Sequence, residues 1–294
     1  MPYKLEALLK ALAQSQLFVF YKKAFCCWSI IACFTEGKCP VQLTQQSATN
    51  KQFLLKKTLI IFDIDGTLVF SNKVDSQCFA ETYDKVYGRP FPSIDWRRYP
   101  HVTDHAIFHS VIREQFGRPC EPGEIEAFQN HFVELLEQKR KEQPEGFREV
   151  PGARETVLRL LGHPDYAVGI GTGGWHRPAC LKLNHVNIPL ENIYLSAADG
   201  KETRKAIIEE AVHFSKQKHR SFERIVYVGD AVWDVRTTRN MSMNFVGIRK
   251  DGDVDVLRRE GAAVVLEDFS DHDAFLRAVQ TAVPPKKNQE RGTI

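Results

Sequence analysis

The 294-residue sequence predicts an α/β fold: a doubly wound, Rossmann-like parallel sheet with an all-helical segment inserted into it. Three observations lead to this prediction. Short apolar runs of strand length recur from residue 58 onward, helix-length segments separate most of them, and residues 74–147 contain no convincing strand. Short buried strands that alternate with helices are typical of parallel sheets covered on both faces.

The predicted strands are short and mostly apolar. The first is TLIIF at 58–62, and the later ones lie at 166–170, 193–195, 224–228, 245–248 and 262–266. Glycines or acidic residues follow several of them, as expected where a strand ends in a loop. The chain contains no internal repeat and no low-complexity tract.

The inserted segment has the pattern of three helices. Thr103 or Asp104 can cap the helix that ends at Gly117. A breaker-rich stretch at 144–152 (PEGFREVPG) then returns the chain to the sheet. An apolar stripe at helical spacing predicts a further helix and consists of Ile125, Phe128, Phe132, Leu135 and Leu136.

Residues 1–52 are expected to be an N-terminal extension and linker of unknown role. The net charge of the chain is +3, but residues 1–57 hold eight lysines against two glutamates, so the remainder is slightly acidic. This charge distribution argues against a nucleic-acid-binding body. The apolar run at 24–34 is shorter than the ~20 residues that span a bilayer, so no stable membrane insertion is expected.

The cysteines favour a cytoplasmic protein. Seven are present, and those at 78, 120 and 180 show no paired spacing, which indicates small apolar side chains in a reducing compartment. The alternative is a protein that is exported or lipid-anchored through residues 22–33, because a basic pair precedes an apolar run of signal-peptide length there.

Polar side chains collect where the predicted strands end. Because ligands bind at the carboxyl ends of parallel strands, these side chains are expected to converge at one edge. Carboxylates that share a cleft repel one another unless a cation lies between them, and oxygen ligands favour Mg²⁺. The residues are Asp63 and Asp65 after the first strand, Thr172 and Gly173 after the second, and Asp230 and Asp234 after the strand at 224–228.

This pattern resembles the haloacid dehalogenase-like (HAD) superfamily of phosphohydrolases over about residues 57–283. The run DIDGT at 63–67 matches the first motif of the family, Thr172 the second, and Gly229-Asp230 with Asp234 the fourth. The resemblance implies a HAD catalytic core at 53–72 and 148–283, a helical C1-type cap at 73–147 and a tail at 284–294. Phosphoglycolate phosphatase-like proteins are the branch that we expect.

The resemblance also implies chemical roles. Asp63 would be the nucleophile that forms an aspartyl-phosphate, and Asp65 would protonate the leaving alcohol and later activate water. The metal would be Mg²⁺, bound by the carboxylates of Asp63 and Asp230 and by the backbone carbonyl of Asp65.

The remaining motif residues would bind the phosphate or support the metal. Thr172 and Gly173 would hold phosphoryl oxygens, and Asp234 would orient metal-bound waters or pair with a basic residue. The family has that basic residue near the start of the helix after the third strand. Arg204 is favoured because it leads directly into an apolar helical stretch, and Lys201 is the alternative.

Aromatic and polar residues near a break between two helices of the insert have two interpretations. They would either contact the leaving group of the substrate and select it, or pack and cap the helices. Their spacing favours neither interpretation. They are Trp96, Tyr99, His101, Asp104 and His105.

The expected function is a Mg²⁺-dependent phosphomonoester hydrolase that acts on a small phosphorylated metabolite. A sugar-phosphate mutase of the same family is the alternative, and a non-catalytic phosphate-binding regulator is the alternative from a different class. A haloacid dehalogenase is disfavoured, because in that branch an aromatic residue typically takes the place of Asp65. Nucleic acid is not an expected partner, and the sequence identifies neither the substrate nor the oligomeric state.

Overall fold

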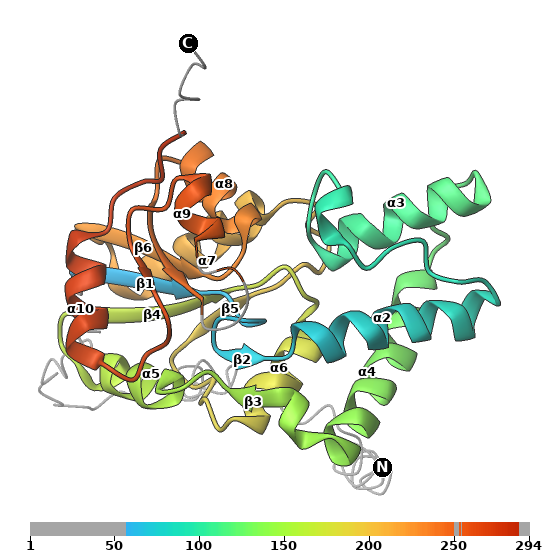
Figure 1. Ribbon diagram of the computed structural model, residues 1–294, viewed down its shortest axis with the longest axis horizontal. Helices are drawn as coiled ribbons and strands as arrows, with labels where there is room; N and C mark the ends of the chain where they lie inside the picture. The colour runs from blue at the N-terminus through green and yellow to red at the C-terminus, as the bar shows by residue number, and fades with distance from the viewer. Residues whose placement is uncertain (1–56, 250–252, 254, 288–294) are drawn as a thin grey trace, which may run out of the picture. The chain divides into compact units, whose positions relative to one another are not determined.

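A computed structural model describes residues 57–249, 253 and 255–287 (Figure 1). The predicted extension at 1–52 lies outside the described residues, and so do positions 288–294 of the predicted tail. The alternative of anchoring through residues 22–33 concerns the same undescribed part of the chain.

The predicted parallel sheet is present. Its six strands are all parallel, in the order β5-β4-β1-β6-β7-β8. In register, Phe62 at the end of β1 pairs with Ile170 and Val228 of its two neighbours. The strands are β1 (Thr58–Phe62), β4 (Tyr166–Gly171), β5 (Tyr194–Ser196), β6 (Arg224–Gly229), β7 (Asn244–Ile248) and β8 (Val265–Leu266).

The last strand is shorter than predicted. Residues 262–264 fall outside β8, because Gly261 adopts a left-handed φ of 112° and the Ala262 amide donates to the carbonyl of Leu257. That hydrogen bond belongs to a helix C-terminus, so the chain enters the sheet only at Val265.

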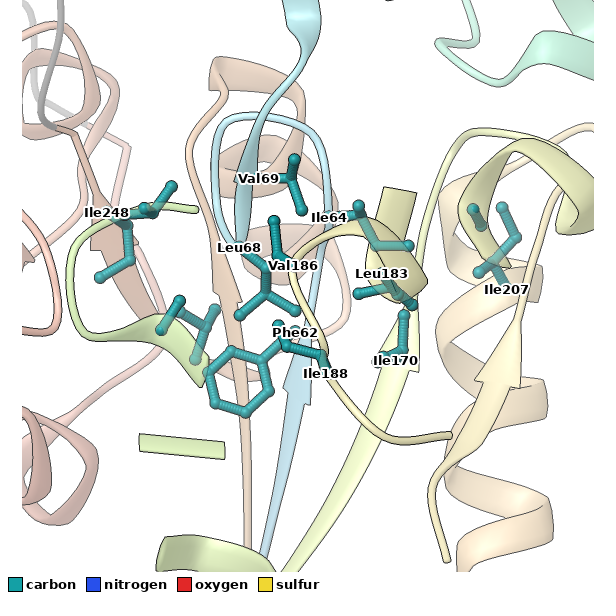
Figure 2. Packing of buried hydrophobic residues seen from close by; sticks show 14 of the residues in the cluster. Phe62, Ile64, Leu68, Val69, Ile170, Leu183, Val186, Ile188, Ile207 and Ile248 are labelled. Carbon is teal, nitrogen blue, oxygen red and sulfur yellow. The ribbon is translucent and has the colours of Figure 1, made fainter. Parts of the chain in front are cut away.

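Both faces of the sheet are buried, as the uninterrupted apolar runs require. On β1, Ile60 and Phe62 point to one side and Leu59 and Ile61 to the other, and all four are fully buried. Figure 2 shows Phe62 of the first side beside Leu68, from the loop after β1, and Val186 and Ile188, from the segment that follows residue 185.

Helices cover the two faces. The side of Phe62 packs against α5 (Ala153–Gly162), α6 (His176–His185) and α10 (His272–Thr281). The opposite side packs against another three helices, which are α7 (Arg204–His219), α8 (Val232–Asn240) and α9 (Val256–Glu260). This arrangement confirms the doubly wound fold.

The insert is helical, as predicted. Its helices are α2 (Asn72–Tyr87), α3 (Asp104–Phe116) and α4 (Glu124–Glu142), with short 3-10 helices η3 (Trp96–Arg98) and η4 (Pro144–Phe147). Thr103, rather than Asp104, caps α3: its hydroxyl accepts a hydrogen bond from the Ala106 amide.

A two-stranded antiparallel pair lies where the chain enters and leaves the insert. It joins β2 (Val69–Phe70) to β3 (Arg148–Glu149). These strands are not among the predicted ones, because two residues are too few to show an alternating pattern.

Candidate active site

The loop after β1 brings the first motif beside the loop after β6. Gly66 adopts a left-handed φ of 79°, and a Cβ at this position would overlap the Asp230 carboxylate. A glycine is therefore required both by the backbone conformation and by the close approach of the two loops.

Three carboxylates of this edge lie close together. Asp63, Asp230 and Asp234 each offer an oxygen atom, all within 4.8 Å of one another, and all three residues are buried. Asp63 Oδ1 has no hydrogen-bond partner among the described residues. A buried carboxylate oxygen without a donor fits a divalent cation, which prefers oxygen ligands.

The crowding of these carboxylates changes their acidity. Burial raises the pKa of Asp230 well above its usual value, and the nearby Asp234 and Asp63 add to the shift. Burial also raises the pKa of Asp234 to about 7, although Arg204 opposes that rise. A bound cation would relieve this repulsion.

Arg204 supplies the positive charge on one side of the group. Its Nη1 donates to Asp234 Oδ1 at 2.8 Å and to Asp63 Oδ2 at 3.0 Å, and it also lies 3.3 Å from the Tyr227 hydroxyl. Burial opposes the charge of the guanidinium, but the carboxylates of Asp234 and Asp63 hold its pKa well above the usual value.

The structure brings Arg204, and not Lys201, to the predicted site. Thr203 caps α7 by accepting from the Ala206 amide, so Arg204 is the first residue of the helix. Lys201 lies before the cap and its Nζ pairs with Glu210 Oε2 at 3.0 Å.

Thr172 and Gly173 lie at the end of β4, on the same pocket as Asp63. The Thr172 amide donates to the Ser196 carbonyl, and the Thr172 hydroxyl accepts a 3.3 Å hydrogen bond from the Gly174 amide. A Cβ on Gly173 would lie 2.7 Å from Arg204 Nη2 and 2.8 Å from the backbone carbonyl oxygen of Val102, so a larger residue would displace the guanidinium and the backbone.

Asp65 lines the same pocket but is not one of the three clustered carboxylates, and it has its own partners. The Ser71 hydroxyl and Lys182 Nζ each donate to Asp65 Oδ1 at 2.6 Å. Lys182 also pairs with Asp75, in the first turn of α2. Burial opposes the charge of Lys182, but Asp65 and Asp75 raise its pKa above the usual value.

Ser71, Asp75 and Lys182 are not among the residues predicted from the sequence. One signal was present: Lys182 lies three residues after Ala179 and four before Val186, on the buried face of α6. A lysine on an apolar helix face needs a buried anionic partner.

The pocket at this edge has a volume of about 90 Å³ and is shared by core and insert. The Asp104 amide donates to the Gly173 carbonyl at 2.8 Å, and the Trp175 amide donates to Asp104 Oδ2 at 3.0 Å. Trp96 and Asp104 line this pocket, whereas Tyr99 and His101 line a larger neighbouring cavity of about 410 Å³.

The sequence matches the model of a known protein family over the region that contains most of the sheet and the motifs. The model described as haloacid dehalogenase-like hydrolase matches residues 60–248. The chain therefore belongs to the haloacid dehalogenase-like hydrolases, and the expectation of a hydrolytic enzyme is confirmed at the level of the family.

Solved structures share this fold at low sequence identity. A hydrolase from Pseudomonas syringae is 20% identical, with a TM-score of 0.58 and coverage of 76% of this chain and 99% of its own. A putative beta-phosphoglucomutase from Bacteroides vulgatus is 16% identical, with a TM-score of 0.54, and the match covers 79% of this chain and 92% of that protein. CbbY from Rhodobacter sphaeroides in complex with phosphate is 15% identical, with a TM-score of 0.53, and the match covers 74% of this chain and 96% of that protein.

No curated protein matches the sequence. Among the described residues, no helix combines the length and the apolar character needed to cross a bilayer.

Proposed function

We propose that the chain is a Mg²⁺-dependent phosphomonoester hydrolase that acts on a small metabolite through an aspartyl-phosphate. The observation that carries the proposal is the position of Asp63. Its buried carboxylate accepts a hydrogen bond from Arg204 through Oδ2, its Oδ1 has no hydrogen-bond partner among the described residues, and two further carboxylates lie nearby. Membership of a hydrolase family supports the same reaction class.

In the first step, Asp63 attacks the phosphorus in line with the ester oxygen. The bond between phosphorus and the ester oxygen breaks as the bond to the carboxylate forms, and Asp65 gives a proton to the departing alcohol. In the second step Asp65 takes a proton from a water molecule, whose oxygen displaces the carboxylate and releases inorganic phosphate. Both residues line the same small pocket.

Mg²⁺ would be held by the carboxylates of Asp63 and Asp230 and by the backbone carbonyl of Asp65, with Asp234 as a supporting acid. When bound, it would supply the positive charge that lets an anionic carboxylate approach an anionic phosphate. The buried carboxylates are the observation that supports this metal.

Arg204, Thr172 and Gly173 would bind the transferring phosphoryl group. A guanidinium carries several donors in one plane, which suits phosphate oxygens better than the point charge of a lysine. Through its contacts with Asp63 and Asp234, Arg204 is held in place before any substrate arrives.

The insert would act as a cap that limits the size of the leaving group. Trp96, Thr103 and Asp104 of the insert line the pocket together with the core residues, and the volume of the pocket is about 90 Å³. Exclusion of water during the first step is the chemical benefit of such a cover.

The test is release of inorganic phosphate from 4-nitrophenyl phosphate and from a panel of phosphorylated metabolites, including phosphoglycolate and sugar phosphates. We expect release with Mg²⁺ and none with a chelator. Isomerisation of a sugar phosphate without net phosphate release would instead identify a mutase. Binding of Mg²⁺ and phosphate without turnover of any ester would identify a regulator.

A further inference from the structure

Lys182 is a cation enclosed within the protein. Its side chain is 1% exposed, and it lies on the helix face of α6 that is otherwise apolar. Burying an ammonium group is costly unless anions compensate for it, and here two carboxylates do so: Asp65 from the loop after β1 and Asp75 from the insert. An apolar side chain would fill this position at lower cost, so the charge calls for an explanation in function.

The contacts with Lys182 act on one oxygen of Asp65. Oδ1 accepts both from Lys182 Nζ and from the Ser71 hydroxyl, each at 2.6 Å. Oδ2 faces the second-motif loop instead: a Cβ added at Gly174 would lie 3.9 Å from it and 3.7 Å from Thr172 Oγ1. Two short hydrogen bonds to one oxygen therefore anchor that side of the carboxylate and leave the other oxygen toward the second-motif loop.

We propose that Lys182 is a positioning residue that holds the Asp65 carboxylate with Oδ2 toward the leaving group. The proposal rests on the proposed function, in which Asp65 transfers the proton. Because its charge is shared with Asp75, the same lysine links the first turn of α2 to the acid. Correct seating of the insert and correct orientation of Asp65 thus depend on one side chain.

The kinetic test compares two phosphate esters that differ in their need for a proton. Nitrophenolate leaves readily without protonation, whereas an alkyl alkoxide does not. We expect Lys182→Met to lower kcat/KM for an alkyl phosphate at least about ten-fold more than for 4-nitrophenyl phosphate, because general acid catalysis contributes ~10²-fold or more. Asp65→Asn should show the same dependence on the leaving group.

A matched control separates this effect from general loss of an ion pair. Lys139 of α4 is also a largely covered lysine that pairs with a carboxylate of α2, Glu81, at 3.7 Å. Lys139→Met should change kcat/KM for both esters equally or not at all. The double variant Lys182→Met/Asp75→Asn removes two opposite buried charges, so we expect it to fold even where the single variant does not.

A crystal structure of Lys182→Met provides a readout that does not need activity. The expected result is an Asp65 side chain in a different rotamer, with Oδ2 no longer toward the second-motif loop. An unchanged Asp65, or an equal loss for both esters, overturns the proposal. A wild-type protein that hydrolyses no ester would overturn the proposed function, while the orientation of Asp65 would still decide this inference.

Discussion

Arg204 Nη1 lies 3.0 Å from Asp63 Oδ2, and the same nitrogen lies 2.8 Å from Asp234 Oδ1. One donor thus bridges a carboxylate at the end of β1 and another in the first turn of α8. The bridge leaves Asp63 Oδ1 without a hydrogen bond among the described residues. The two oxygens of Asp63 therefore have different surroundings before any ligand binds.

Replacing Arg204 tests this bridge. Arg204→Gln removes the charge shared by two buried carboxylates, so we expect a loss of stability of about 3 kcal/mol and a fall in kcat/KM of at least ~100-fold. Lys201→Gln should retain nearly full activity, because Lys201 pairs with Glu210 away from Asp63. Thermal unfolding and phosphate release measure the two effects, and a larger loss of activity in Lys201→Gln would reverse the assignment.

Asp63→Asn should abolish turnover while the fold persists. An amide cannot form the aspartyl-phosphate, so we expect a loss of at least ~1,000-fold in kcat. The change keeps the size of the side chain and removes one of three crowded acids, so the melting temperature should not fall. Phosphate release at the wild-type rate would show that another group attacks the phosphorus.

Mg²⁺ should stabilise the folded protein. A ligand that binds only the folded state at 100 times its Kd adds ~2.7 kcal/mol, which raises the melting temperature by several degrees. Asp230→Asn should remove most of this Mg²⁺-dependent shift, because Asp230 belongs to the carboxylate group. Asp104→Asn is the matched control: Asp104 lines the same pocket but lies outside that group, and its variant should keep the shift.

Glu124 should make the stability of the insert depend on pH. Hydrogen bonds from Arg118, with help from Tyr87 and the Glu121 amide, lower the pKa of Glu124 from 4.5 to about 2. A carboxyl group whose pKa is lower in the folded state stabilises the protein above pH 4.5. That stability is lost as the pH falls from 4.5 toward 2.

Glu124→Gln should therefore cost about 1 kcal/mol at pH 7, a value reduced for the solvent that reaches the Arg118 side chain. The difference from wild type should shrink as the pH falls below 4.5. Glu155→Gln is the control, because Glu155 forms an exposed pair with Arg159 and should change stability little at any pH. A pH-independent difference for Glu124→Gln would contradict the ion-pair explanation.

Much of the sheet could be predicted because its strands are buried on both faces. The run at 58–62 has no polar side chain after Thr58, and β1 has the predicted bounds. The pair β2–β3 could not be predicted, since two-residue strands are defined by their partners and not by a pattern of their own. Tertiary contacts also decide the start of β8, where a helix C-terminus displaces the strand.

The convergence of Asp63, Asp230 and Asp234 follows from parallel topology, so their approach could be predicted from strand ends alone. Arg204 was favoured over Lys201 because it leads into an apolar helical stretch, but the sequence alone did not exclude Lys201. The cap at Thr203 distinguishes the two, because it makes Arg204 the first residue of α7 and leaves Lys201 before the helix. Lys182 was missed for a different reason. It reaches Asp65 from a helix 117 residues further along the chain, and no local motif marks such a contact.

The β2–β3 pair has a consequence for how this protein can change over evolutionary time. Val69 pairs with Glu149 and Phe70 with Arg148, so the points where the insert starts and ends are neighbours. A segment whose two ends already meet can be exchanged for one of different length or shape without moving the strands beneath it. The pair is thus a site at which the insert can be replaced during evolution. Such a replacement can change the substrate range while the acidic residues at the edge of the sheet stay the same.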